Sequence, residues 1–344
     1  MPLSRYLKAT GKLLAGMLVA MGAASCVHQF PEPIENGIVM LEVKHDLQWL
    51  PDYEMTISRA DEAGYVIRYD FRIYPHGNTT NLVKAVTIYK DNLMRPDFTT
   101  EINLVPGEYD IYAWSDYAYA STEDAVYYDD ADFADITYIK PYEGDTDLRD
   151  AFRGVTTVTV DDPGLMEPTP VSGVITLARP LARYKFIATD LAAFIDRETT
   201  RGRLTPSEDD VLLGDGNPRW AKLSDYKVKV IYPMYMPAVF NNFKNNPVDS
   251  WTGVTFDCKM LQLSGDDAQL AMDYVYVNGE ESSVQVMLEV YDPDGLLLAR
   301  TTSITVPTKR NRTTIIYGKF LTTLRSDGVG IDPDFEGEYN IQLP

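Results

Sequence analysis

The sequence predicts an all-β protein built from two tandem antiparallel β-sandwich domains. Apolar and polar residues alternate with a period of two, as in Val39, Leu41 and Val43 against their neighbours, which is the pattern of half-buried strands. Clusters of glycine, proline and aspartate separate the alternating stretches, and one short stretch has a helical pattern. Strands and helices do not alternate regularly, which argues against a doubly wound or TIM-barrel fold.

The first 25 residues have the organisation of a secretory signal peptide. Three basic residues lie between positions 5 and 12, and the apolar run Leu13–Met21 that follows is too short to span a bilayer. The stretch ends in Ala23–Cys26, where three small residues precede a cysteine, as in a bacterial lipobox. The alternative is an ordinary signal peptide that is cut just before an incidental cysteine.

A lipobox makes Cys26 the first residue of the mature chain and its site of lipidation. The sulfur then carries acyl chains such as palmitate, which hold the protein at a membrane. Residues 26–36 contain Pro31 and Pro33 and show no periodicity, so we expect them to form a lipidated tether. The expected location is the outer membrane or cell surface, with the membrane as a partner through the N-terminal lipid.

The first sandwich domain is expected at residues 37–165. Pro106–Gly107 suits the centre of a type II turn, so we expect a hairpin or a tight corner there. In the strand that follows, Tyr109, Ile111 and Ala113 share one face. Three prolines and a glycine between residues 161 and 170 mark the domain boundary. Strand patterns cover Gly37–Lys44, Tyr65–Tyr74, Leu82–Lys90, Glu101–Val105, Glu108–Trp114, Ile136–Ile139 and Arg153–Val160.

The second domain is expected at residues 171–344, and both domains are expected to be of the Greek-key, transthyretin- or immunoglobulin-like type. Asp190–Glu198 is the helix candidate, with Asp190 as the residue that caps it. Asp292–Gly295 predicts a turn between two strands. Strand patterns cover Gly173–Leu177, Ala182–Ala188, Tyr226–Tyr232, Val284–Val290, Leu296–Val306 and Arg312–Leu321.

The charge of the chain argues strongly against nucleic acid as a partner. The formal net charge is −20, and it becomes −23 when the three basic residues of the signal are removed, whereas nucleic-acid binding needs a basic surface. Cys258 lies in a strand pattern and predicts a buried, inert thiol. If Cys26 carries lipid, no intrachain disulfide can form.

Acidic clusters are the candidates for chemistry, and each has a simpler interpretation. Asp129, Asp130, Asp132 and Asp135 offer oxygen ligands for calcium, but their spacing lacks the glycine and the final glutamate of an EF-hand loop. We therefore expect a solvated loop and no metal site. A glycosidase needs two carboxylates at a defined separation, and no motif of a hydrolase, metalloprotease or nucleotide-binding fold occurs. The sequence predicts neither an enzyme nor a cofactor.

Aromatic residues gather in the first half of the chain. Their rings can stack on sugars or anchor a protein interface, although tyrosine is also a common strand residue. Both interpretations stay open at this point. The candidate contacts to a ligand or partner are Trp114, Tyr117, Tyr119, Tyr127 and Tyr128.

The chain resembles the fimbrillin-like surface lipoproteins of Gram-negative gut and oral bacteria, which include type V pilus subunits and their membrane anchors. The lipobox at Cys26 is one point of similarity, and Leu104–Trp114 is similar to a leucine, proline, glycine, tyrosine corner of that family. Leu177–Phe186 resembles the opening strand of the family's second domain. Val306–Gly318 resembles a late strand motif in which an Arg-Asn pair precedes threonines, and Asp332–Glu338 resembles the ending.

The resemblance implies two β-sandwich domains and a structural role. It implies a non-catalytic, lipid-anchored anchor, accessory or tip subunit that docks other fimbrial subunits by β-strand addition. Stalk subunits of the family are processed after an early basic residue, but here Lys44 is the first one after Cys26, inside a strand, and Arg59 is the first arginine. The alternative from another class is a surface glycan-binding lipoprotein that uses the aromatic residues as a platform.

Overall fold

The fold is all-β, as the sequence predicts. The computed structural model describes residues 37–47, 64–91, 93, 95–162, 164, 169–202, 222–263, 265–322 and 339–342. The signal segment, Cys26 and the tether at residues 26–36 lie outside the described residues. Within the described part of the chain, no helix is long and apolar enough to cross a bilayer.

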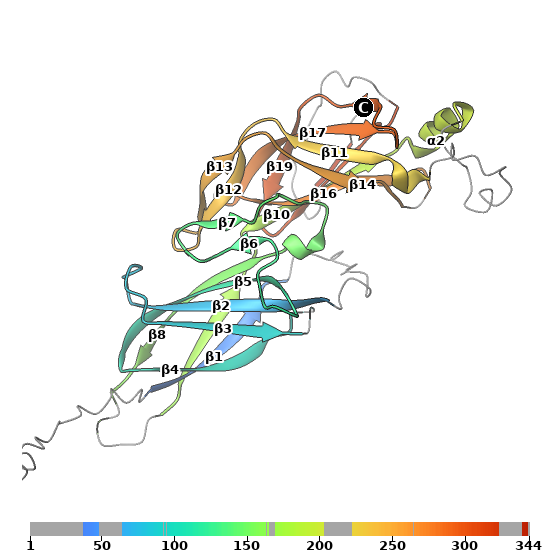
Figure 1. Ribbon diagram of the computed structural model, residues 1–344. Coiled ribbons are helices and arrows are strands. Elements are labelled where there is room, and N and C mark those ends of the chain that lie inside the picture. The colour runs from blue at the N-terminus through green and yellow to red at the C-terminus, as the bar shows by residue number, and fades with distance from the viewer. Residues whose placement is uncertain are drawn as a thin grey trace, which may run out of the picture.

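The first sandwich consists of two sheets that pack face to face (Figure 1). One sheet has the order β4–β1–β9, in which β1 pairs antiparallel with β4 and parallel with β9. The other has the order β3–β2–β5–β8 and is antiparallel throughout. The strands are β1 (Gly37–His45), β2 (Tyr65–Pro75), β3 (Lys84–Lys90), β4 (Phe98–Leu104), β5 (Gly107–Tyr119), β8 (Phe152–Val160) and β9 (Val171–Leu177).

The period-two pattern explains how this sandwich is held together. Val39, Leu41 and Val43 of β1 are buried, and they pack in one cluster with Phe71 and Ile73 of β2. The alternate residues of β1 are half-buried. Burial of one face of each sheet removes apolar area from water, which is the main stabilising term of such a core.

The second sandwich is built from three sheets. Their orders are β15–β16–β10–β20–β21, β14–β11–β17–β18 with β19 also paired to β17, and β13–β12–β7–β6. The strands are β6 (Tyr128–Asp129), β7 (Ile136–Tyr138), β10 (Leu181–Ala188), β11 (Lys227–Tyr232), β12 (Met236–Asn241), β13 (Asn246–Trp251), β14 (Val254–Lys259), β15 (Leu261–Gln262), β16 (Ala268–Tyr276), β17 (Glu281–Tyr291), β18 (Leu297–Arg300), β19 (Ile304–Lys309), β20 (Thr313–Gly318) and β21 (Tyr339–Gln342).

The strand pairing differs from the expected boundary between residues 165 and 171. β9, which was expected to open the second domain, lies beside β1 in the first sandwich. In the other direction, β7 pairs with β12, so residues 128–138 belong to a sheet of the second sandwich. The two sandwiches therefore exchange segments, and a linear division of the chain does not describe them.

The corner at Pro106–Gly107 joins the two sheets of the first sandwich rather than two strands of one sheet. β4 pairs with β1, whereas β5 pairs with β2 and β8. The hydroxyl of Tyr109 donates a hydrogen bond to the Val105 carbonyl at 3.0 Å and closes the corner. A Cβ atom at Gly107 would lie 3.0–3.2 Å from the Tyr109 ring, so the close packing explains the glycine.

The predicted helix exists as α2 (Leu191–Thr200), but its expected cap does not form. The Asp190 carboxylate instead accepts hydrogen bonds from the Leu321 and Thr322 amides. The first turn of the helix is capped from another loop, where an oxygen of the Asp266 side chain accepts a bond from the Ala192 amide. The local sequence thus predicts where the helix forms, whereas its cap comes from Asp266, which is distant in the sequence.

Candidate functional site

Three of the five candidate aromatic residues lie in the protein interior. Trp114 and Tyr128 are fully buried, with ring centroids 5.5 Å apart, and Tyr117 is also buried. Trp114 and Tyr117 are enclosed because both faces of this part of β5 are covered, and Tyr128 of β6 packs against Trp114. The predicted aromatic platform is therefore wrong for these three residues, since a buried ring cannot stack on a sugar from solvent.

The other two candidates do not restore the platform. Tyr119 is 43% exposed at the end of β5, with its ring 5.6 Å from that of Tyr65. Tyr127 is half-buried and packs against the hydrophobic clusters. The structure thus leaves one exposed candidate, Tyr119, which pairs with a residue that the sequence reasoning had not selected.

The carboxylates of the acidic loop, which were the candidate calcium ligands, bind backbone amides and an arginine instead. Asp129 and Asp132 each accept a hydrogen bond from a backbone amide two residues further along the chain. Asp130 turns inward and pairs with Arg68 at 2.9 Å. Among the described residues, no group of three or more His, Cys, Asp or Glu side chains converges as metal ligands do.

Cys258 is a buried thiol, as predicted. It lies in β14 and is 3% exposed. Burial, followed by the charges of Asp145 and Asp273, raises the pKa of the thiol well above its ordinary value. The uncharged thiol therefore persists at neutral pH, and a nucleophile or metal ligand would need the thiolate.

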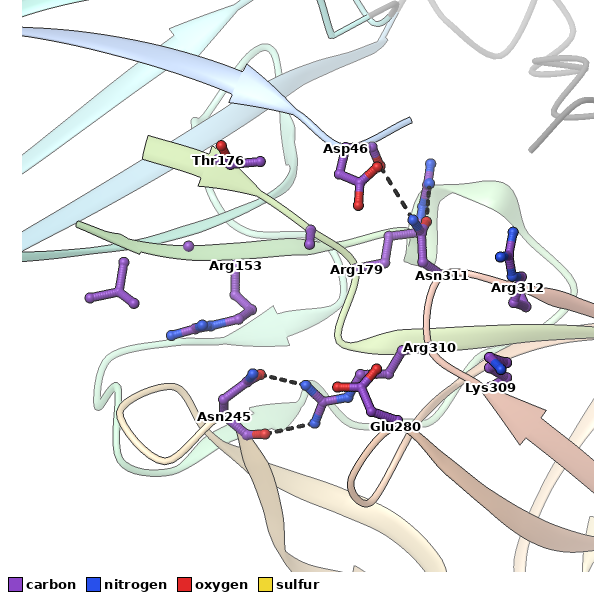
Figure 2. Close-up of a pocket in the computed structure, with 13 residues that line it drawn as sticks. Asp46, Arg153, Thr176, Arg179, Asn245, Glu280, Lys309, Arg310, Asn311 and Arg312 are labelled. Atoms are coloured by element: carbon purple, nitrogen blue, oxygen red, sulfur yellow. Dashed lines mark hydrogen bonds between the residues drawn. The ribbon is translucent and has the colours of Figure 1, made fainter. Parts of the chain in front are cut away.

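A polar cleft of about 390 Å³ lies where the two sandwiches meet, and Figure 2 shows its lining. We call it the interdomain cleft. Five basic and two acidic side chains line it, in a chain whose net charge is −20. The lining residues are Asp46, Arg153, Gly154, Val155, Thr176, Ala178, Arg179, Asn245, Glu280, Lys309, Arg310, Asn311 and Arg312.

Asn311 holds the two walls of the cleft together. It lies in the turn between β19 and β20, with φ at +56°, a left-handed conformation that asparagine tolerates better than most residues. Its side-chain amide donates to the Asp46 carbonyl at 3.5 Å, and its side-chain oxygen accepts a bond from Arg179 at 2.8 Å. Asn311 of the Arg-Asn pair thus contacts the residues that follow β1 and β9 of the first sandwich, as Figure 2 shows.

Arg179 is neutralised inside the protein. Its Nε and Nη2 atoms donate to the two carboxylate oxygens of Asp150 at 2.7 and 2.9 Å, and both residues are buried. The guanidinium also lies 4.3 Å from the centre of the Phe152 ring. In this bidentate pair, the carboxylate of Asp150 compensates most of the charge of Arg179. Arg179 therefore lines the cleft without adding much net charge to it.

Arg153 has neutral partners. Its Nε and Nη2 atoms donate to the side-chain oxygen and the backbone carbonyl of Asn242 at 3.0 and 2.8 Å. Asn242 in turn donates to the Ala113 carbonyl at 3.2 Å, which ties the second sandwich to β5. Burial, followed by the positive charge of Arg310, lowers the pKa of Arg153 to about 10.

Arg310 is held in the same manner from the other wall. Its Nη1 atom donates to the Asn245 side chain at 2.7 Å, and its Nη2 atom donates to the Asn245 carbonyl at 2.6 Å and the Val277 carbonyl at 3.2 Å. Burial lowers the pKa of this guanidinium, while the charge of Glu280 opposes that effect. Two arginines from different sandwiches are therefore fixed at one cleft by neutral oxygen atoms.

The sequence alone does not predict this cleft as a site. Lys309–Arg312 forms part of the Val306–Gly318 motif, whereas Arg153 begins an ordinary strand pattern. The sequence does contain one signal of the cleft: three basic residues lie within residues 309–312, although the chain as a whole is acidic. No local pattern marks Arg153 as a cleft residue, because its place in the same cleft as Arg310 depends on how the two sandwiches dock.

The profile of a family of unknown function, DUF6562, matches residues 35–344. The chain belongs to this family. A search of curated proteins finds no match to it.

Solved structures similar to this DUF6562 chain include adhesin candidates and fimbrial proteins. A candidate adhesin from Bacteroides ovatus is 9% identical, with 77% of this chain and 76% of that chain covered and a TM-score of 0.41. The fimbrial anchor protein Mfa2 from Porphyromonas gingivalis is 10% identical, with 76% and 81% covered and a TM-score of 0.37. The tip fimbrial protein Mfa3 from the same organism is 11% identical, with 81% and 94% covered and a TM-score of 0.39.

Proposed function

We propose that the protein is a non-catalytic, lipid-anchored cell-surface protein that acts as an anchor, accessory or tip subunit of a fimbrial assembly. The lipobox at Cys26 provides the attachment, and the two joined sandwiches provide a body on which other molecules dock. The observation that carries the proposal is the direction of β1.

β1 runs from the outer end of the first sandwich toward the second sandwich. Gly37 lies against Leu104 and Val160 at the outer end. At the other end, the Asp46 carbonyl accepts a bond from Asn311 of the second sandwich. Nine strand residues span roughly 30 Å. A tether attached at Gly37 would hold the first sandwich nearer the membrane than the second one, because the second sandwich lies beyond the other end of β1.

Edge strands of the first sandwich support docking by strand addition. β3 is the last strand of its sheet, and β2 is its partner within the described part of the chain. It has seven residues and a lysine at each end, and its residues are half-buried or exposed. An added strand would extend the sheet through backbone hydrogen bonds, while alternate side chains would set its register.

Replacement of the lipobox cysteine tests the anchor. We expect Cys26→Ser to release the protein from the membrane fraction, because no acyl chain can then be attached. The measurement is fractionation of cells with alkaline washing, followed by mass spectrometry of the mature N-terminus. Cys258→Ser is the matched control, since it removes the other cysteine and should leave the protein membrane-bound.

The second arm of the test measures surface display and docking. Protease added to intact cells should degrade the wild-type protein, and purified fimbrial filaments should contain it. An unmodified mature N-terminus would remove the anchor from the proposal. Complete protection from protease together with absence from filaments would overturn the surface role.

A further inference from the structure

The interdomain cleft contains two arginines, Arg153 and Arg310, that form no ion pair with a carboxylate among the described residues, although Glu280 lies near enough to Arg310 to raise its pKa. Asp150 pairs with Arg179, and Glu281 pairs with Lys309 at 2.5 Å. Arg153 and Arg310, in contrast, bond to amide and carbonyl oxygens. Both guanidiniums are half-buried, so water screens their mutual repulsion less than it would on an open surface.

An anion in the cleft would relieve this repulsion. Arg153 and Arg310 line the same cleft, and the positive charge of Arg310 adds to the effect of burial in lowering the pKa of Arg153. A guanidinium has five donors, and the bonds to Asn242 use Nε and Nη2 of Arg153. Its remaining Nη1 group is the donor with which Arg153 can bind an anion.

The acidic residues of the cleft indicate which anion fits. Glu280 and Asp46 line the same space as the arginines. A sulfate or phosphate, which mainly accepts hydrogen bonds, would be repelled by these carboxylates. A monocarboxylate with several hydroxyl groups can place its charge at the arginines and donate hydroxyl protons to acidic side chains. Thr176 and Asn245 add further hydrogen-bonding groups.

We propose that the interdomain cleft binds a uronic acid residue of an acidic glycan, with Arg153 and Arg310 at the sugar carboxylate. The volume of about 390 Å³ lies within the range of small-molecule sites, about 300–1,000 Å³. One wall comes from β8 and the other from the β19–β20 turn, so the site exists when the sandwiches are docked. The proposal goes beyond the anchoring role and does not depend on it.

Binding of trigalacturonate to the purified full-length protein tests the proposal. We expect calorimetry to show saturable binding of trigalacturonate. The fully methyl-esterified trimer should bind at least about tenfold more weakly, because the ester cannot form the charge-assisted hydrogen bond. Sodium sulfate is the comparison for a simple anion. Equal affinity for the acid and the ester, or tighter binding of sulfate than of the sugar, would overturn the proposal, as would failure of trigalacturonate to bind.

Arg153 variants locate the site. We expect Arg153→Gln to weaken trigalacturonate binding about tenfold or more, and Arg153→Lys to retain part of the affinity because it keeps the charge. Arg300→Gln is the matched control, since Arg300 is an exposed arginine paired with Glu289 outside the cleft.

A second variant distinguishes loss of the binding site from loss of folding. Lys309→Gln removes a partly exposed cation of the cleft and should weaken binding severalfold while the melting temperature stays near that of the wild type. If both Arg153→Gln and Lys309→Gln bind as the wild type does, the ligand lies elsewhere and the assignment is wrong. Because this assay measures the purified protein, its failure is distinguishable from failure of the anchor at Cys26.

Discussion

At the scale of single residues, Asp130 is a group whose ionisation is opposed by folding. Arg68 donates to both Asp116 and Asp130 at 2.9 Å, so one cation serves two buried carboxylates. Burial, followed by the negative charge of Asp116, raises the pKa of Asp130 from 3.8 to about 7, and Arg68 offsets this only in part. Asp70 and Arg72 of β2 complete the charged surroundings.

The shift predicts how stability depends on pH. Between about pH 4 and pH 7 the folded state holds a proton on Asp130 that the unfolded state has released, so the free energy of unfolding falls as pH rises. Asp130→Asn should reduce this fall and raise the free energy of unfolding at pH 7 by about 1–3 kcal/mol. Urea unfolding at several pH values measures it.

The control for this prediction is Asp129→Asn. Asp129 is the exposed neighbour whose carboxylate bonds to a backbone amide, so its replacement should leave the pH dependence unchanged. An Asp130→Asn variant with the wild-type slope between pH 4 and pH 7 would contradict the account.

At the scale of elements, β5 shows what periodicity can predict. Tyr109, Ile111 and Ala113 share one face, as expected, and pack in the core of the first sandwich. Trp114, on the opposite face, packs in the core of the second one. Alternation placed these side chains on the correct faces, but it could not show that the second face is covered by another sandwich rather than by solvent.

Helix α2 yields a prediction about its cap. Asp266→Ala should lower the opening free energy of the first turn of α2 by about 1 kcal/mol, because the Ala192 amide loses its acceptor. Hydrogen exchange of the α2 amides is the measurement. Asp196→Ala, an exposed position on the same helix, is the control.

The same helix tests the role of Asp190. Because its carboxylate binds the amides of Leu321 and Thr322, Asp190→Ala should loosen residues 320–322 more than the helix start. Faster exchange in the first turn of α2 for Asp190→Ala than for Asp266→Ala would show that the sequence-based cap assignment was correct after all.

At the scale of the whole molecule, β5 of the first sandwich contributes side chains to the cores of both sandwiches, and we call this arrangement a shared core. One hydrophobic cluster contains Trp114, Tyr128 and Tyr138 from the first half of the chain together with Phe240 and Tyr276 from the second. The rings of Tyr138 and Tyr276 are stacked with centroids 5.0 Å apart. Unfolding of one sandwich would therefore expose the interior of the other.

This shared core predicts one cooperative unfolding transition. Trp114→Ala should destabilise the protein by about 3–5 kcal/mol, and hydrogen exchange should show loss of protection in both sandwiches together. Calorimetry of the full chain checks the number of transitions. Two separate transitions, or loss of protection confined to the first sandwich, would show that the units are independent. Val155→Ala, at an exposed position on β8, is the control.

The sequence by itself determined the fold class, most strand positions, the buried thiol and the presence of α2, because these follow from local periodicity and propensity. The lipid anchor at Cys26 remains a prediction. Tertiary structure alone decided that β9 pairs with β1, that β7 pairs with β12, and that Arg153 lines the same cleft as Arg310. Such pairings join residues far apart in the chain, and they follow from which faces can be buried together rather than from any local pattern.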